Sequence, residues 1–354
     1  MNSQPATRSE TSVCQCAKSA LNAWSPRPIP SPWPPRKPVL GIDFGTSYSS
    51  AAVCVDGRVS FALDGGDAAI PTMVYVPTSG PLVVGREALR LGFSDPFNVV
   101  TSVKRLLGLG WGDPALRALD AGSSFALHQG PGGQVLIRIQ KQELAPVQLA
   151  AAVLARLRKL AEARFGGSFR RAVFTVPAQR PAGYGAALTL AARLTGLEVI
   201  DQVPEPVAGF VAQGLDRPGE RRVAVVDFGG GTFDATLMEQ RGLRFASRAI
   251  GGDGFLGGDD LDHALADAVD GVLARKGRRP LRNDQVKWRQ LLWRSESVKR
   301  QLSSAASARL QLRDRLSPAS DIDLSVDRAW IEPRWQSLVD RGVGVVRELL
   351  ARAG

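Results

Sequence analysis

Two turns in this chain combine carboxylates, hydroxyls and glycines in a way that suits phosphate chemistry. The first turn spans residues 43–47 and reads Asp-Phe-Gly-Thr-Ser. The second spans residues 227–232, reads Asp-Phe-Gly-Gly-Gly-Thr, and is soon followed by Asp234. Glycines let backbone N–H groups approach an anion closely, and hydroxyls add hydrogen-bond donors. Because each turn also carries a carboxylate, the pair predicts nucleotide phosphates and Mg²⁺ bound between the turns, with the ion held largely through its waters.

The elements that must position these turns are β-hairpins. Apolar runs flank both turns, and the first is followed by a second turn with the hairpin signal Asp56-Gly57. Three glycines in a row between strands are costly in backbone entropy, so an ordinary hairpin loop explains residues 229–231 poorly. The recurrence of the pattern predicts an internal duplication. We place a first lobe at residues 39–221 and a second lobe at residues 222–354.

The stretches between the turns alternate between helical and strand patterns, which predicts a layered α/β fold. In the first lobe we expect a subdomain inserted at about residues 75–149, with strands near 82–85 and 135–139. The predicted elements that follow are a helix over 146–165, a strand over 171–176, a helix over 181–195 and a strand over 197–203. In the second lobe we expect helices over 285–303 and 333–352.

Composition narrows the class of protein. The chain has 354 residues, three Cys and two His, which argues against a disulfide scaffold and a His-rich metal centre. It has no apolar run of about 18 residues, so we expect no membrane-spanning helix. The net charge of +11 is concentrated in residues 275–315. Such a segment can bind nucleic acid, but it lacks a recognition motif, and we expect a solvated basic helix.

Residues 1–38 differ from the rest of the chain. Prolines crowd residues 26–38, which predicts an extended, disordered tail. Cys14 and Cys16 form an isolated Cys-x-Cys pair that we interpret as incidental thiols. Because the tail has no apolar signal core and the chain has few cysteines, the sequence favours a cytoplasmic location.

Several segments together resemble the nucleotide-binding domain of the heat shock protein 70 (DnaK-like) chaperones, within the actin and sugar-kinase ATPase superfamily. In chain order the similar segments are residues 41–49, 100–108, 203–210, 227–234, 251–262, 281–284 and 296–304. The resemblance implies an actin-like ATPase fold, in which two lobes are built on duplicated ribonuclease-H-like sheets. It also implies an ATP-binding, slowly hydrolysing chaperone-like protein that uses ATP/ADP and Mg²⁺.

Roles for individual residues are carried over from the same resemblance. Asp43, Glu205 and Asp227 would surround Mg²⁺ and the attacking water, while Lys104 would contact the γ-phosphate. The residues implied in catalysis are Lys104, Asp43, Glu205, Asp227 and Thr232. The residues implied in nucleotide binding are Gly45, Thr46, Ser47, Tyr48, Gly229, Gly230, Gly231, Asp234, Gly258, Glu296, Lys299, Arg300 and Ser303. The last four would hold ribose and adenine, and their i, i+3, i+4, i+7 spacing independently places them on one helix face.

Two departures from the family pattern limit what the resemblance implies. Pro177 is present in the segment used for interdomain signalling, but the position of the partner Arg holds Gly185. The chain also ends in a segment that resembles the helix before the family's second adenosine motif. We therefore expect a second lobe that lacks strands and has an exposed sheet edge. A truncated gene, a split gene completed by a second polypeptide, and a degenerate paralogue all fit this pattern.

Two functions follow from these observations. The first is the ATPase, with co-chaperones or a nucleotide-exchange factor as partners and a C-terminal polypeptide that could complete the fold. The alternative is a catalytically weak or inactive nucleotide-binding remnant that acts as a protein-interaction module. We expect neither nucleic acid nor a membrane among the partners.

Overall fold

The computed structural model describes residues 38–116, 119, 125–215, 217–242, 244–313 and 321–353. The predicted tail, with Cys14 and Cys16, lies outside the described residues except for Pro38. No helix in the described part of the chain is long and apolar enough to span a membrane.

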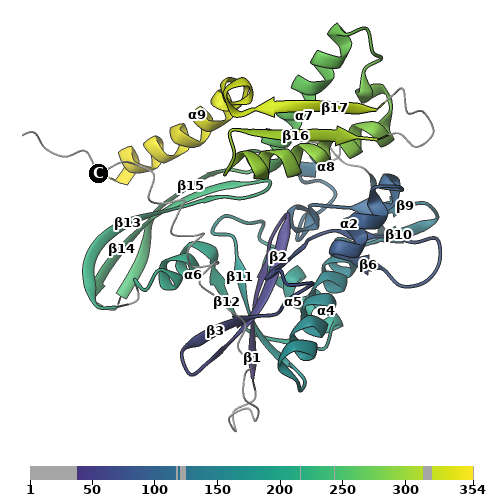
Figure 1. The fold of residues 1–354 in the computed structure, drawn as a ribbon. Helices are drawn as coiled ribbons and strands as arrows, with labels where there is room; N and C mark the ends of the chain where they lie inside the picture. Colours follow the sequence, from purple (N-terminus) through teal and green to yellow (C-terminus); the bar gives the residue numbers. More distant parts are fainter. Residues whose placement is uncertain are drawn as a thin grey trace, which may run out of the picture. The chain divides into compact units, whose positions relative to one another are not determined.

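The first large sheet carries the first hairpin at its centre. Its strand order is β12-β11-β1-β2-β3, with β4 paired to the side of β2 (Figure 1). These strands are β1 (Val39–Phe44), β2 (Tyr48–Val55), β3 (Arg58–Phe61), β4 (Ala69–Pro71), β11 (Arg171–Val176) and β12 (Glu198–Pro204). β1 is antiparallel to β2 and parallel to β11. Asp56 and Gly57 both have positive φ, as a tight two-residue turn between β2 and β3 requires, so the predicted hairpin is confirmed.

Helices α4 (Pro146–Phe165), α5 (Tyr184–Leu194) and α6 (Glu205–Ala212) accompany this sheet. α4 forms as predicted because its apolar residues recur at helical spacing and are buried, and it ends at Gly166, where φ is 73°. α5 begins at Tyr184, three residues later than the pattern indicates, because the N–H of Tyr184 closes a turn onto the carbonyl of Pro181.

Two small sheets and short helices occupy residues 74–144. One sheet has the order β6-β5-β7 and the other β10-β9-β8. The elements are β5 (Val74–Tyr75), β6 (Val83–Val84), α2 (Arg86–Gly92), η1 (Pro96–Asn98), β7 (Val99–Val100), η2 (Val103–Leu106), β8 (Ala126–Gln129), η3 (Pro131–Gly133), β9 (Val135–Ile139) and β10 (Gln142–Leu144). The strands predicted near residues 82–85 and 135–139 are confirmed. The subdomain boundaries themselves stay a prediction.

The second half of the chain opens with a three-stranded meander in the order β13-β14-β15. The elements of this half are β13 (Gly219–Phe228), β14 (Phe233–Gly242), β15 (Arg244–Asp253), α7 (Gly258–Arg275), η4 (Leu281–Asn283), α8 (Gln285–Leu302), β16 (Ser307–Leu312), β17 (Ile322–Asp327) and α9 (Arg328–Ala353). α9 packs along β15 and β14 (Figure 1). It starts five residues before the predicted start at Pro333, which lies inside the helix.

The two halves repeat one hairpin, but its surroundings differ. Asp43-Phe44-Gly45 at the end of β1 corresponds to Asp227-Phe228-Gly229 at the end of β13. β1 pairs with β11 along the edge that faces away from β2, whereas within the described residues β13 pairs with β14 alone. Ile42 is 2% exposed, and the corresponding Val226 is 48% exposed. The exposed edge expected from the sequence is therefore present in the described residues.

Candidate functional site

Each Asp-Phe-Gly turn is closed by its own hydrogen bonds. In the first turn the N–H of Gly45 donates to Ser49 Oγ over 3.2 Å, and Ser49 Oγ lies 2.7 Å from Thr72 Oγ1. In the second turn the N–H of Gly229 donates to the carbonyl of Thr232 over 2.9 Å. Both turns thus have hydrogen bonds of their own at the closed end of their hairpins.

The two turns contact each other directly through Gly230, the middle glycine of residues 229–231. A Cβ built on Gly230 would lie 1.8 Å from Ser47 Oγ and 2.8 Å from Ser47 Cβ, so a side chain at this position would require Ser47 to move. The second turn also lies on the start of α7, where the N–H groups of Gly258 and Asp259 donate to the carbonyls of Gly229 and Gly230 over 2.9 and 2.7 Å. Glycine at position 230 therefore permits the close approach of the two turns.

Carboxylates and one lysine gather beside the turns. Lys104 Nζ lies 2.7 Å from Glu205 Oε1, and the two side chains are only 12% and 17% exposed. Asp43 Oδ1 accepts a hydrogen bond from Thr175 Oγ1 over 2.6 Å. Burial raises the pKa of Glu205; Lys104 opposes this shift, and the charges of Asp43 and Asp227 add to it. Lys104 and the three predicted carboxylates are therefore close enough to interact electrostatically.

The second hairpin contributes two more carboxyl groups. Asp227 and Asp234 lie opposite each other in the register of β13 and β14. Burial raises the pKa of both, and the charge of Asp227 further raises that of Asp234, while a hydrogen bond with Thr232 lowers it. Desolvated carboxylates that repel one another favour a cation among them.

The carboxylates beside the two turns are the candidate ligands for Mg²⁺. Among the described residues, no group of three His, Cys, Asp or Glu side chains lies close enough to hold a metal ion. Asp43, Glu205 and Asp227 nevertheless interact through their charges. These carboxylates do not form a direct set of metal ligands, so they could hold Mg²⁺ only through waters that the ion keeps.

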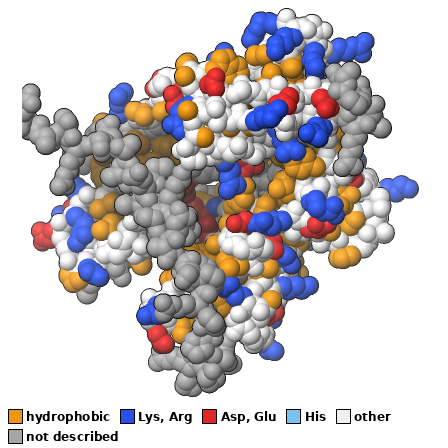
Figure 2. All heavy atoms as spheres, viewed as in Figure 1, with side chains coloured by type: hydrophobic (Ala, Val, Ile, Leu, Met, Phe, Trp, Pro, Cys, Tyr) orange, Lys and Arg blue, Asp and Glu red, His pale blue; other side chains and the backbone are white. Residues whose placement is uncertain are grey.

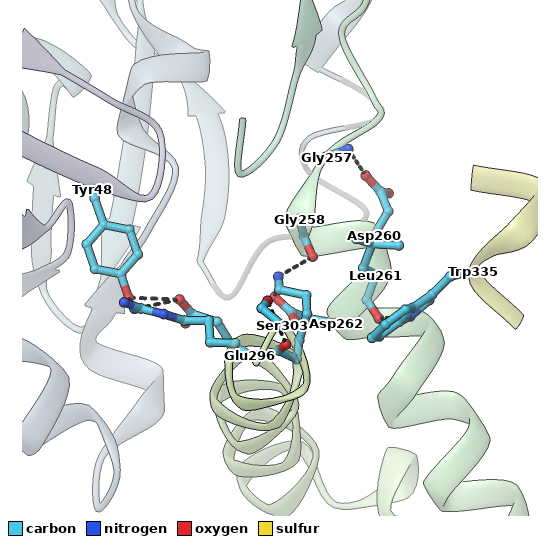
Figure 3. A network of polar contacts seen from close by, with 11 residues as sticks. Tyr48, Gly257, Gly258, Asp260, Leu261, Asp262, Glu296, Ser303 and Trp335 are labelled. Carbon is cyan, nitrogen blue, oxygen red and sulfur yellow. Dashed lines mark hydrogen bonds and ion pairs between the residues drawn. The ribbon is translucent and has the colours of Figure 1, made fainter. Parts of the chain in front are cut away.

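The residues predicted for the nucleoside divide into two groups. Tyr48 Oη donates to Glu296 Oε1 over 2.8 Å and accepts from Arg300 Nη1 over 2.5 Å, and the Arg300 guanidinium lies 5.1 Å from the centre of the tyrosine ring (Figure 3). Burial, and then the charge of Glu296, raises the pKa of Tyr48 to about 12. These contacts join the first hairpin to α8.

Lys299 and Ser303, the other two residues of this helix face, form their hydrogen bonds with α7 and with α8 itself and not with Tyr48. Lys299 Nζ donates to the carbonyl of Gly258 and to Asp262 Oδ2, each over 2.7 Å, and so ties α8 to the start of α7. Ser303 Oγ donates to the carbonyl of Lys299 over 3.4 Å, at the end of its own helix (Figure 3).

Two cavities adjoin these residues. A cavity of about 570 Å³ is lined by Thr46, Ser47, Tyr48, Arg105, Trp288 and Glu296, among others. A smaller cavity of about 230 Å³ is lined by Glu205, Asp227 and Asp234 together with residues of β13. The larger volume lies within the range of small-molecule sites, and the smaller one is lined by the carboxylates.

Two residues at the site were missed by the sequence analysis. Arg105, next to Lys104, donates to the carbonyls of Gly231 and Gly254, and its guanidinium lies 5.5 Å from the ring centre of Phe255. Its position inside the segment 100–108, next to Lys104, could have marked it as a residue of the site. Tyr184 is buried near Glu205 and Asp43 and carried no signal, because only the folded chain brings it there.

Much of the basic segment is engaged within the protein. Among its described residues, Lys299 pairs with Asp262, Arg282 with Asp267, and Arg309 with Asp323 over 2.6 Å. Arg289 Nη1 donates to the carbonyl of Pro96 over 2.6 Å. On the face drawn in Figure 2, Lys and Arg side chains lie scattered among acidic and neutral ones. The segment therefore contributes to internal packing as well as to surface charge.

Comparisons with known proteins agree with the fold. A family model described as Hsp70 protein matches residues 39–354. The chain is similar to the chaperone protein HscA homolog of Bordetella petrii, with 36% identity over 324 residues that cover 90% of this chain and 50% of that protein. It is also similar to the chaperone protein DnaK of Buchnera aphidicola subsp. Schizaphis graminum, with 32% identity over 327 residues that cover 89% of this chain and 51% of that protein.

The chain thus spans about half the length of the curated relatives it matches. Its mixed α/β architecture, with two repeated hairpin sheets, is consistent with the actin-like ATPase domain of this family. Together with the family match over nearly the whole described chain, these relatives settle its classification: the chain belongs to the Hsp70 family.

Proposed function

We propose that this chain binds Mg²⁺-ATP between its two Asp-Phe-Gly hairpins and hydrolyses it slowly, as a chaperone-like ATPase. The observation that carries the proposal is the convergence of Lys104, Glu205, Asp43 and Asp227 beside two hairpins that meet at Ser47 and Gly230. Family membership supports it, since members of the Hsp70 family are ATPases. Phosphoryl transfer needs mainly positioning and charge stabilisation, which this arrangement can supply.

The residues have distinct tasks in this proposal. The ammonium of Lys104 has three N–H donors, of which Glu205 takes one, so the others can reach phosphate oxygens. The carboxylate of Glu205 can accept a hydrogen bond from the attacking water. Asp43 and Asp227 would hold Mg²⁺ through its waters, with Thr232 and the backbone of residues 229–231 near the phosphates. Bound Mg²⁺ would neutralise charge on the phosphates.

The nucleoside would occupy the larger cavity, which Tyr48 and Glu296 line, and Arg300 contacts Tyr48 beside it. A guanidinium can stack on a flat purine, and a carboxylate can accept from ribose hydroxyls. We therefore place ribose and adenine against the face of α8 that carries Glu296 and Arg300, with Lys299 and Ser303 supporting that helix.

Removing the lysine tests the catalytic assignment. Lys104→Ala should lower single-turnover hydrolysis by about 10²-fold or more, because charge stabilisation at the transferring phosphoryl group is lost. The matched control is Lys141→Ala, in the exposed turn between β9 and β10, which should leave the rate within twofold. Equal rates for wild type and Lys104→Ala would overturn the role of this lysine.

Chaperone partners belong to the proposal as well. We infer a slow cycle in the cytoplasm that co-chaperones or a nucleotide-exchange factor regulate. Gly185 occupies the position where the family pattern has an Arg for coupling to a substrate domain. A Cβ on Gly185 would lie 2.8 Å from Gln202 Oε1, and the carbonyl of Gly185 accepts a hydrogen bond from Gln202 Nε2 over 3.0 Å. Gln202 thus fills the space that a longer side chain would need.

The uncovered edge of β13 favours a second candidate function, a protein-interaction module. Val226 and Phe228 are 48% and 41% exposed, while the corresponding Ile42 and Phe44 of β1 are buried. Val339, Val343 and Leu350 of α9 are also exposed. In the first half of the chain, β11 pairs with the edge of β1, and α5 packs against α4. We infer that a second polypeptide supplies equivalent strands and a helix to the exposed edge of β13 and to α9. If this function replaces ATP turnover, the folded chain will bind such a polypeptide and show no hydrolysis.

A further inference from the structure

The phenol of Tyr184 is a buried donor without a partner. The side chain is 2% exposed, and among the described residues no atom forms a hydrogen bond with Tyr184 Oη. Buried polar groups in folded proteins are nearly always hydrogen-bonded, because leaving one unpaired costs stability. An unpaired phenol therefore calls for a partner that is not part of the protein chain.

Backbone packing fixes the position of Tyr184. It is the first residue of α5, and its N–H donates to the carbonyl of Pro181 over 3.0 Å. The loop after η2 lies against it: a Cβ on Gly108 would be 2.3 Å from the Tyr184 nitrogen, and φ of Gly108 is +78°. The same loop follows directly on the turn of η2 that carries Lys104. Tyr184 and Lys104 are thus held on neighbouring backbone segments.

The phenol lies close enough to the carboxylates of the candidate site to interact with their charges. Burial and then the charges of Glu205 and Asp43 raise the pKa of Tyr184, and Arg180 opposes them, so the group remains a protonated donor. Both carboxylates already have partners, since Glu205 accepts from Lys104 and Asp43 accepts from Thr175. The O–H of Tyr184 is accordingly available to a small third group held among these side chains.

We propose that Tyr184 is a positioning residue whose O–H donates a hydrogen bond to the attacking water held between Lys104, Glu205 and Asp43. The inference rests on the proposed ATPase function. One lone pair of the water would accept from Tyr184, which leaves the other directed at the phosphorus atom. The phenol would fix the direction of the water while the lysine and the carboxylates provide charge.

Tyr184→Phe tests this role, with Tyr75→Phe as the matched control. Tyr75 Oη donates to Asp95 Oδ2 over 2.9 Å, so its loss removes a bond that the ligand-free protein already makes. We expect Tyr75→Phe to lower the melting temperature of the ligand-free protein and to leave hydrolysis within twofold. Tyr184→Phe should leave that melting temperature unchanged or higher, because it removes an unpaired polar group.

Two ligand measurements complete the test. Tyr184→Phe should keep the Kd for Mg²⁺-ADP within twofold of wild type and lower single-turnover hydrolysis about tenfold. It should also lose most of the extra thermal stabilisation that aluminium fluoride adds to the Mg²⁺-ADP complex, since that group mimics the phosphoryl group with its in-line water.

Different results would overturn the positioning role of Tyr184 and the proposed ATPase function. Unchanged hydrolysis and unchanged aluminium fluoride stabilisation in Tyr184→Phe would make Tyr184 a core residue only. A fall in the ligand-free melting temperature as large as that of Tyr75→Phe would show that the phenol is already paired, and would also reject the inference. Failure of the wild-type protein to bind Mg²⁺-ADP would instead reject the proposed function on which the inference rests.

Discussion

Ser47 and Gly230 bring the two halves of the chain into contact at their Asp-Phe-Gly turns, where a Cβ on Gly230 would lie 1.8 Å from Ser47 Oγ. Ser47 lies in the turn between β1 and β2, and Gly230 in the turn between β13 and β14. The contact shows why the second turn needs glycine at this position. It also makes the separation of the hairpins sensitive to a single methyl group.

Gly230→Ala should therefore force the hairpins apart. We expect the Kd for Mg²⁺-ATP to rise at least about tenfold, since a misplaced phosphate loop loses well-aligned hydrogen bonds. The matched control is Gly344→Ala in α9, where a Cβ meets nothing within 4 Å. It should leave binding unchanged and stabilise the helix by up to about 1 kcal/mol. Isothermal titration calorimetry measures the first effect, and urea unfolding measures the second.

A second substitution checks the cause. Ser47→Gly combined with Gly230→Ala removes the Oγ and Cβ atoms that the new methyl group would strike. The double variant should recover part of the lost affinity. If Gly230→Ala alone binds as tightly as wild type, the hairpins do not need this contact.

Stability should depend on pH through Asp262. Its Oδ2 contacts Lys299 while Oδ1 is buried without a hydrogen bond, and burial raises its pKa to about 7. An unfolded Asp releases its proton near pH 3.9, so between about pH 4 and 7 the folded state holds more protons. The contribution of Asp262 to the free energy of unfolding must then fall as pH rises, by at most about 1.4 kcal/mol per pH unit.

Asp262→Asn isolates this contribution, because other groups also titrate. Urea unfolding at pH 5, 6 and 7 should show a shallower loss of stability with rising pH in Asp262→Asn than in wild type. Asp323→Asn is the control: Arg309 lowers the pKa of Asp323 to about 2, so its titration lies below this window and its slope should match wild type. Identical slopes for Asp262→Asn and wild type would contradict the assignment.

The edge of β13 predicts different outcomes for two equivalent positions. Val226→Lys places a charge on an exposed site and should change the free energy of unfolding by less than about 1 kcal/mol. Ile42→Lys buries an unpaired charge at the corresponding site of β1 and should prevent folding. Circular dichroism and urea unfolding distinguish these results. A Val226→Lys variant as unstable as Ile42→Lys would mean that this edge is covered.

Sequence reasoning succeeded where local chemistry decides the structure. The Asp-Phe-Gly turns, the Asp56-Gly57 turn and the apolar spacing of α4 each specify their element through residues that lie close together in the chain. The ends of helices were less accurate, because the start of α5 depends on the turn at Pro181, and α9 contains Pro333 instead of starting there.

The directions of side chains could not be read from the sequence. The spacing of Glu296, Lys299, Arg300 and Ser303 indicates one helix face, yet Glu296 and Arg300 contact Tyr48 while Lys299 reaches α7. Which way each side chain turns depends on the elements packed against α8. Tyr184 illustrates the same limit, since the packing of α5 on the loop after η2 places its phenol.

The most direct test of the account is a calorimetric titration of the purified wild-type chain with Mg²⁺-ATP and Mg²⁺-ADP, followed by single-turnover hydrolysis. We expect saturable binding of one nucleotide per chain with a Kd in the micromolar range or tighter, followed by slow hydrolysis of ATP. A chain that circular dichroism shows to be folded, but that gives neither heat of binding nor thermal stabilisation at millimolar nucleotide, would contradict it.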